Sequence, residues 1–277
     1  MRHPYVRSAI AIVVATVATT AAAARTAVVN LQFGDPEQSP RYTGTGAAPD
    51  TGTTWNFFGG TSRGGDGQAF GGGGGVNDLV DSTGATTTVD FSASSVGYFL
   101  SPYRTGSSFG IGPSGVSDDA YDALTRSSLE SPDRPRTFSV GGLQVNATYA
   151  LYLYGAANHD QYEAFGGNAK FTVGAVTKST TGANYARTSL VEGRDYVLIE
   201  AVSNASGVIN ITVDRTDLGV ADVNGVPTTN SPQSRWTFNA LQIVDVPAQV
   251  PEPGAIGVLL VAGSSAFLRR RQRHASA

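Results

Sequence analysis

Residues 28–33 read Val-Val-Asn-Leu-Gln-Phe, and this stretch decides the fold class of the chain. The apolar side chains at positions 29, 31 and 33 alternate with Val28, Asn30 and Gln32. A period of two predicts a β-strand that is packed on one side. Later runs share this pattern and are rich in Val, Ile, Thr, Tyr or Phe between turn residues. These runs are residues 86–91, 96–100, 136–140, 148–154, 169–173, 196–202, 208–213 and 235–244.

A helix of useful length is predicted only for residues 117–129, with Ser117 as N-cap before Asp118 and Asp119 in the first turn. One short helix beside so many strands favours two packed antiparallel sheets. The predicted fold class is therefore all-β, an antiparallel β-sandwich of the jelly-roll type with one short helix. An N-terminal signal helix and a C-terminal hydrophobic helix are expected to flank it.

The composition limits the function classes that fit this chain. Of 277 residues, 40% are hydrophobic and 15% are charged, with a formal net charge of -3, which excludes acidic disorder. Residues 25–250 hold 13 Lys and Arg against 21 Asp and Glu, a balance of -8 that should repel phosphate, so nucleic acid is excluded as a partner. The chain has no cysteine, which excludes thiol catalysis and cysteine-based metal sites.

The N-terminus has the layout of a secretory signal peptide. Arg2 and Arg7 precede an apolar run at residues 9–18, and small residues follow up to Ala22 and Ala24. This arrangement predicts export through the Sec machinery with cleavage after Ala24. The expected organisation is a signal peptide at 1–24, a β-sandwich domain at 25–247 and a sorting or anchor segment at 248–277.

The C-terminus has a second set of address features. Pro251, Glu252 and Pro253 precede an apolar stretch at residues 255–268, and a basic cluster closes the chain with Arg269, Arg270 and Arg271. Fourteen residues span about 21 Å as a helix, which is short for a bilayer core of about 30 Å, but snorkelling arginines let such a tail dock. The positive-inside rule places those arginines in the cytoplasm, so a transient inner-membrane anchor is expected.

These last residues resemble the PEP-CTERM sorting signal of bacteria that make exopolysaccharide. The resemblance covers about the last 27 residues, with the Pro-Glu-Pro motif, the apolar stretch and the arginines in the family's order. It implies that a membrane-embedded exosortase processes the tail and that the protein reaches the cell surface or extracellular matrix. An ordinary anchor with a chance Pro-Glu-Pro is the alternative.

The strand pattern over residues 143–244 resembles bodies of exported PEP-CTERM proteins, which are similar to galactose-binding-like and other carbohydrate-binding jelly rolls. The resemblance implies a fold of the sugar-binding type, and a fold alone does not fix a function. A glycine-rich loop is expected at residues 59–75. It is not a phosphate cradle, because no helix or Lys-Ser/Thr pair follows the glycines.

Candidate glycan-binding residues cluster in one predicted loop. Asn158, His159, Asp160 and Tyr162 follow the strand at 148–154, and Trp55 lies in a second loop. Planar polar groups beside an aromatic ring suit a sugar, whereas a solvated polar loop is the plain alternative. Trp55 is expected to be more exposed than Trp236, which is assigned to the core. Tyr152 and Tyr154 share one strand face and fit either core or platform.

A calcium site is a further candidate. Asp214, Asp217, Asp222 and Asn224 place oxygen ligands on one segment, and the last two with Gly225 echo part of an EF-hand loop. The glutamate that closes such a loop is absent, and an Asp/Asn/Gly turn region explains the residues equally. Ca²⁺ is therefore the only cofactor considered.

The predicted function is that of an exported, noncatalytic protein at the cell surface, associated with exopolysaccharide and able to bind carbohydrate. No catalytic residues are assigned, because His159 is the only histidine between the two address segments and a Ser-His-Asp site would have to be built around it. The alternatives are a polysaccharide-degrading enzyme, either lyase or glycosidase, and a purely structural surface protein.

Overall fold

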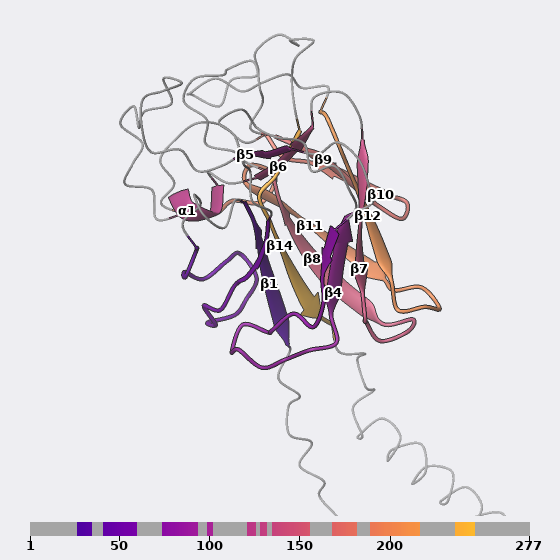
Figure 1. The fold of residues 1–277 in the computed structure, drawn as a ribbon. Helices are drawn as coiled ribbons and strands as arrows, with labels where there is room; N and C mark the ends of the chain where they lie inside the picture. The colour runs from indigo at the N-terminus through magenta and orange to yellow at the C-terminus, as the bar shows by residue number, and fades with distance from the viewer. Residues whose placement is uncertain are drawn as a thin grey trace, which may run out of the picture.

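The structure is a computed structural model that describes residues 27–34, 41–59, 74–93, 99–101, 121–125, 128–131, 135–155, 168–181, 189–216 and 236–246. Within these residues the fold is almost entirely β (Figure 1). Strands form two larger sheets and one small sheet. The prediction of an all-β, mainly antiparallel fold is confirmed, whereas its finer assignment to the jelly-roll type stays a prediction.

The first sheet has five strands in the order β11-β8-β14-β1-β2. All its pairs are antiparallel except β1 with β2, which run parallel. The predicted strands at 148–154 and 196–202 agree with the observed bounds. Its strands are β1 (Val28–Phe33), β2 (Asn56–Phe58), β8 (Thr148–Tyr154), β11 (Tyr196–Val202) and β14 (Ala240–Asp245).

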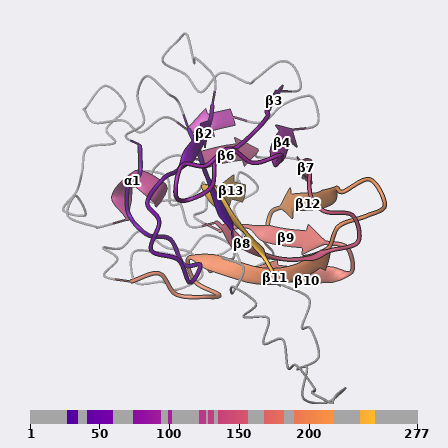
Figure 2. The ribbon, with the colours of Figure 1, turned by 90° about the horizontal axis from the view of Figure 1, so that it is seen from below.

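The second sheet has six antiparallel strands in the order β10-β9-β12-β7-β4-β3. They are β3 (Gly74–Val76), β4 (Asp90–Ala93), β7 (Arg136–Gly141), β9 (Lys170–Val173), β10 (Val176–Ser179) and β12 (Ile209–Asp214). A third sheet joins β13 (Trp236–Phe238), β6 (Ser128–Ser131) and β5 (Phe99–Ser101), and the helix α1 spans Asp122–Thr125. Viewed from below, β10 lies beside β11, so these two edges close one side of the sandwich (Figure 2).

The core between the sheets is built from alternate side chains of both. Phe238 lies at its centre, with ring centroids 4.6 Å from Phe33, 5.4 Å from Phe138 and 5.3 Å from Phe171. All four rings are buried. Aromatic pairs in such tilted and edge-to-face arrangements add to the free energy gained by burying their area.

Both chain connections of the domain leave from one end of the sandwich. The register pairs Val28, at the start of β1, with Val244 near the end of β14. Figure 1 shows β1 beginning at the lower end, where the arrowhead of β14 points. The tight turns at residues 142–147 and 203–208 lie at this same end, because β7 and β11 run towards it and β8 and β12 run away from it.

Two sequence predictions on local structure are wrong in part. The helix predicted at 117–129 is only four residues long where it is described, because Ser128 and Leu129 already belong to β6 and pair with β5 and β13. The run at 235–244 is two strands, since the chain passes from the small sheet to the five-stranded sheet at Asn239. That residue's side chain donates to the Thr125 carbonyl over 2.9 Å, which marks the crossing.

Candidate functional site

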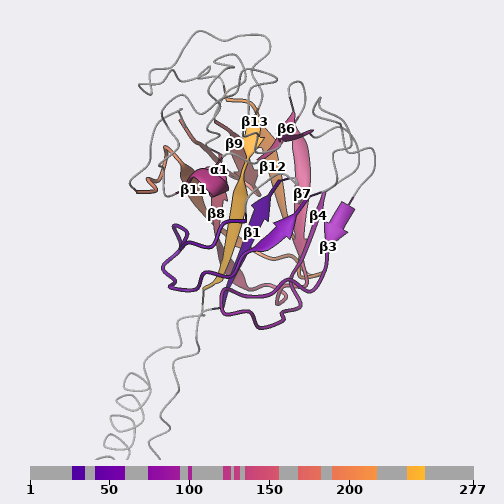
Figure 3. The same ribbon diagram turned by 60° about the vertical axis from the view of Figure 1, so that its left-hand side comes forward.

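The outer face of the five-stranded sheet carries the polar and aromatic side chains of the candidate site. Successive side chains of a strand point to opposite faces, so residues paired across strands share a face. Figure 3 looks towards this face, with α1 and the indigo loop between β1 and β2 in front of the sheet. From β1 to β11, its two central rows are Asn30, Gln242, Tyr152 and Leu198, and then Gln32, Ala240, Tyr154 and Tyr196.

Buried amides occupy this face over β1 and β14. The side-chain oxygen of Gln242 accepts from the Ala48 N–H over 2.9 Å and from the Tyr154 hydroxyl, and its Nε2 donates to Asn30 Oδ1 over 2.7 Å. Gln32 similarly donates to the Ala123 carbonyl over 2.7 Å. The prediction that β1 packs on one side is therefore wrong, because the segment 41–55 and α1 cover its polar face and satisfy its amides.

An aromatic cluster continues the covered part of the face. Trp55 is 8% exposed, its ring centroid lies 5.3 Å from that of Tyr42, and its indole N–H donates to the Gly44 carbonyl over 2.9 Å. Tyr154 is fully buried, and its hydroxyl accepts from the Ala47 N–H over 2.6 Å. Burial raises the pKa of Tyr154 well above its usual range, so this hydroxyl keeps its proton.

Beyond Tyr154 the face becomes accessible. Tyr152 and Tyr196 are half-buried, and their ring centroids lie 5.7 Å apart at an interplanar angle of 36°. We call this pair the tyrosine platform. Burial raises the pKa of both phenols, and the nearby carboxylate of Glu192 raises it further. Both hydroxyls therefore stay protonated at ordinary pH and can donate hydrogen bonds to a ligand.

Glu192 borders the platform. It forms an isolated parallel bridge with Tyr196, an arrangement that puts both side chains on the same side of the pair. Its Oε1 lies 3.2 Å from the Lys178 ammonium, which reaches across from β10 of the other sheet. The two side chains are 47% and 44% exposed, so solvent screens the ion pair and its contribution to stability is at most about 1 kcal/mol.

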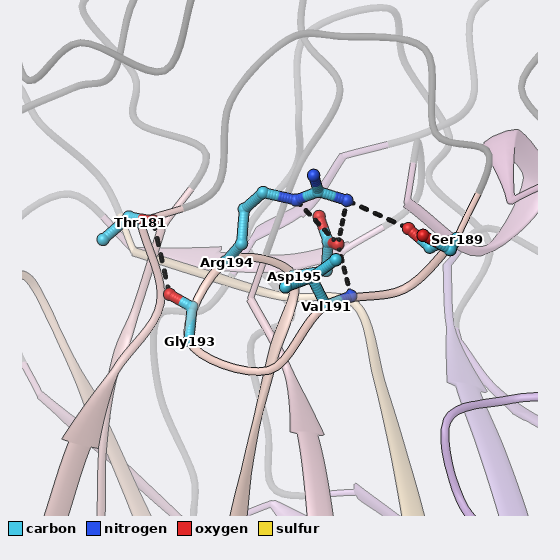
Figure 4. Close-up of polar contacts among 6 residues, drawn as sticks. All are labelled: Thr181, Ser189, Val191, Gly193, Arg194 and Asp195. Atoms are coloured by element: carbon cyan, nitrogen blue, oxygen red, sulfur yellow. Dashed lines mark hydrogen bonds and ion pairs between the residues drawn. The ribbon is translucent and has the colours of Figure 1, made fainter.

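Polar contacts brace the turn at residues 189–195, the segment that contains Glu192 (Figure 4). Asp195 has a fully buried carboxylate whose Oδ2 accepts from the Val191 N–H over 2.8 Å and from Nε and Nη2 of Arg194 over 3.0 and 2.8 Å. Arg194 also donates to the Ser189 carbonyl over 2.9 Å. Gly193 takes a φ of 81°, a left-handed conformation that glycine adopts without strain. The turn is therefore braced at both ends.

This arrangement suits the surface recognition of a sugar chain. The C–H face of a sugar ring packs on an aromatic ring, and its hydroxyls hydrogen-bond to carboxylate, ammonium and phenol groups. The platform, Glu192 and Lys178 offer all of these groups on one accessible surface. Only Glu192 of the two acids at the turn is accessible, because Asp195 is buried under Arg194.

The sequence-predicted glycan residues fall partly within the described chain. Trp55 is more exposed than Trp236, at 8% against 0%, and the assignment of Trp236 to the core is confirmed. The expectation of Trp55 as an exposed ring is nevertheless wrong, because Tyr42 and the segment 41–55 bury it. Asn158, His159, Asp160 and Tyr162 lie outside the described residues.

Of the four residues in the calcium prediction, only Asp214 lies within the described chain. Asp214 accepts from the Arg215 N–H over 2.8 Å, and its Oδ2 lies 3.2 Å from the Lys170 ammonium, so both its oxygens already have protein partners. Asp217, Asp222 and Asn224 lie outside the described residues. Across the part of the chain that is described, no group of three or more His, Asp or Glu side chains is placed to hold a metal ion.

Three residues of the site, Tyr196, Glu192 and Lys178, were missed by sequence reasoning. Tyr152 and Tyr154 were recognised from their alternation, but Tyr196 joins them only through the register of β8 with β11. Glu192 belongs to the site because it forms an ion pair with Lys178 and a bridge with Tyr196. No local sequence pattern predicts these two contacts.

The predicted address segments, including Ala22, Ala24 and the Pro251–Pro253 motif, lie outside the described residues. The described helical content is the single turn α1, which leaves that part of the chain without a helix able to cross a bilayer.

Comparisons with known proteins are sparse. No family model and no curated protein matches the sequence. Solved structures that match include the ANXUR2 extracellular domain from Arabidopsis thaliana, at 9% identity over 79% of this chain and 41% of that chain, with a TM-score of 0.36. The plant receptor-like kinase ANX2 matches at 12% identity and the ANXUR1 extracellular domain from Arabidopsis thaliana at 8%, each over 56% of this chain and 35% of that chain with a TM-score of 0.31. The chain spans less than half of these neighbours, and no activity follows from similarities at this level.

Proposed function

We propose that this protein is an exported, noncatalytic cell-surface protein that associates with exopolysaccharide and binds carbohydrate at the tyrosine platform. The observation that carries the proposal is the pair of partly exposed, neighbouring rings of Tyr152 and Tyr196 beside the exposed Glu192–Lys178 ion pair. An accessible aromatic surface of this kind suits successive residues of an extended sugar chain, with hydrogen-bonding groups at its rim.

The chemistry of the turn favours binding over catalysis. Glycoside hydrolysis needs two facing carboxyl groups, yet the Asp195 carboxylate is fully buried and occupied by Arg194 and the Val191 N–H. A lyase that uses a tyrosine as base needs a phenol that gives up its proton readily. The pKa of Tyr196 is instead raised by burial and by Glu192, which makes its phenolate harder to form. The same groups that suit a sugar are therefore poorly suited to cleaving one.

Replacing either platform tyrosine by alanine should weaken carbohydrate retention. We expect Tyr152→Ala and Tyr196→Ala each to weaken binding about tenfold or more, because a lost aromatic contact is worth about 0.5–1.5 kcal/mol beyond its area. The measurement is affinity electrophoresis of the exported protein in gels that contain neutral, acidic or amine-bearing polysaccharides.

Val202→Ala is the matched control for these variants. Val202 lies on the same face of β11, six residues from Tyr196 and therefore about 20 Å away, and its side chain is 62% exposed. We expect the control to bind as the unmodified protein does. Equal retention of all three variants would contradict the platform, while retention of none of the proteins, unmodified included, would favour a purely structural surface role.

The platform lies at the end of the sandwich opposite to the two chain connections, a position that suits a binding site on a protein attached through its C-terminal segment. Tyr196 is the first residue of β11 and pairs with Tyr154 at the end of β8, whereas the chain enters at β1 and leaves at β14 from the opposite end. If the C-terminal segment holds the protein at a surface, the platform lies at the far end of the sandwich from that attachment. This geometry fits a PEP-CTERM tail that is processed by an exosortase after export by the Sec machinery.

Changing the sorting motif should block processing of the tail. With Pro251, Glu252 and Pro253 all replaced by alanine, we expect a longer species in the inner membrane, because the apolar stretch and arginines persist as an anchor. Intact-mass measurement of the surface fraction checks this, and the unmodified protein should lack residues 255–277 there. An arginine tail that is still attached to the surface protein would contradict processing but leave export intact.

A further inference from the structure

The tyrosine platform already has an ammonium group at its rim. The Lys178 ammonium lies 3.2 Å from Glu192 Oε1, and Glu192 pairs with Tyr196 on the same side of the turn. Lys178 comes from β10, the edge strand of the other sheet, and reaches Glu192 across the side of the sandwich. The protein thus provides a carboxylate that accepts a primary ammonium next to two aromatic rings.

A ligand can displace the Lys178 ammonium from the Glu192 carboxylate. Both partners of the ion pair are close to half exposed, and such surface pairs are weak because water competes for each charge. The braced turn fixes the backbone on both sides of Glu192 through contacts that do not involve Lys178. A ligand ammonium that contacts both Glu192 and an aromatic face gains more than Lys178 gains from Glu192 alone, because a cation is attracted to the ring face.

The net charge of the protein disfavours acidic ligands. Glu192 and the buried Asp195 both lie near Tyr196, and residues 25–250 carry more acidic than basic side chains. Lys178 and Arg194 balance these two carboxylates locally, so a polysaccharide of uronate or phosphate groups is disfavoured by the net acidic charge of residues 25–250. A chain with positive groups meets attraction at Glu192 and at the ring faces alike.

We propose that the tyrosine platform binds a polysaccharide with free primary amines, a polymer of amino sugars that lack N-acetyl groups, whose ammonium displaces Lys178 from Glu192. This inference rests on the proposed carbohydrate-binding function and names the class of sugar that the site selects. Tyr152 and Tyr196 pack against the sugar rings, and the Glu192 carboxylate forms an ion pair with the ligand ammonium. N-acetylation removes the positive charge and with it the interaction that distinguishes this ligand.

The test compares a β-linked glucosamine polymer with the same polymer after full N-acetylation. Binding of both to the exported protein is measured at physiological salt, where long-range attraction to the acidic body is screened. We expect the unmodified protein to prefer the free amine about tenfold. Glu192→Gln should bind both forms equally, with its affinity for the N-acetylated form unchanged, and Lys178→Met should bind the free amine several-fold more tightly.

Glu200→Gln is the matched control, because it removes the same charge from the outer face of β11 four residues from Tyr196. It should keep the full preference. The inference is overturned if the unmodified protein binds both forms equally, if Glu200→Gln loses the preference as Glu192→Gln does, or if Lys178→Met leaves affinity for the amine unchanged. Binding of both forms without preference leaves the proposed function standing, whereas binding of neither form nor of any other polysaccharide removes both.

Discussion

Replacing Phe238 by alanine should lower the free energy of unfolding by about 3–5 kcal/mol, a large fraction of the total stability of a domain this size. Phe238 is fully buried, and its ring packs against Phe33, Phe138 and Phe171 from both sheets. The substitution removes this contact between the layers and leaves a cavity that the rigid strands cannot close. Urea denaturation followed by circular dichroism measures the loss.

The control for this variant is Phe57→Ala on β2. Phe57 is only partly buried and has the Arg41 guanidinium 5.2 Å from its ring centroid, so its removal opens no cavity between the sheets. We expect a loss of about 1 kcal/mol or less. If the two alanine variants lost equal stability, the packing of the two sheets around Phe238 would be wrong.

Replacing Gln242 by leucine should destabilise the protein by about 3 kcal/mol although leucine is apolar and of similar size. Gln242 is 1% exposed and satisfies three groups at once, the Ala48 N–H, the Tyr154 hydroxyl and Asn30 Oδ1. Leucine leaves all three buried without this partner, and each unsatisfied group carries a penalty of about 1–3 kcal/mol that relaxation reduces in part. The same urea titration gives the magnitude.

This variant also tests how the segment 41–55 is held on the sheet. A side chain at Gly46 would collide with the Gln242 amide, which shows how closely the segment approaches. We therefore expect faster proteolysis within 41–55 for Gln242→Leu than for Asn210→Leu, which changes an exposed amide on β12 whose Oδ1 accepts from the Ser139 hydroxyl. Identical stability of the two variants would show that the buried amides contribute nothing.

Local alternation predicted two neighbouring strands of the five-stranded sheet well. The runs at 148–154 and 196–202 agree with β8 and β11, because each carries a continuous period of two over seven residues. The strands β3 and β10 were missed because Gly-Gly-Val and Val-Thr-Lys-Ser carry no apolar alternation. Both are edge strands that backbone pairing holds in place, and such pairing has little signature in side chains.

The candidate site depends on contacts that sequence patterns do not encode. Trp55 lies in a loop without regular structure, and its burial follows from the docking of that loop on β1 and β14. The sequence left open whether Tyr152 and Tyr154 belong to the core or to a binding surface. Tyr154 is fully buried under the segment 41–55, whereas Tyr152 is only half-buried, because the covering segment ends between them. Asn30 and Gln32 looked solvent-facing by their chemistry, yet tertiary hydrogen bonds make their burial favourable.

The most direct test of the account is a titration of the exported protein, ring-labelled at its tyrosines, with glucosamine oligosaccharides in free-amine and N-acetylated forms. The chain has 11 tyrosines, so the variants Tyr152→Phe and Tyr196→Phe are needed to assign the NMR signals of the two platform rings. We predict that these two NMR signals shift on binding while that of Tyr149, buried on the opposite face of β8, stays in place. If the ligand shifts the signal of Tyr162 and leaves Tyr152 and Tyr196 unchanged, sugar binds at the loop of residues 158–162 and the platform is not the site.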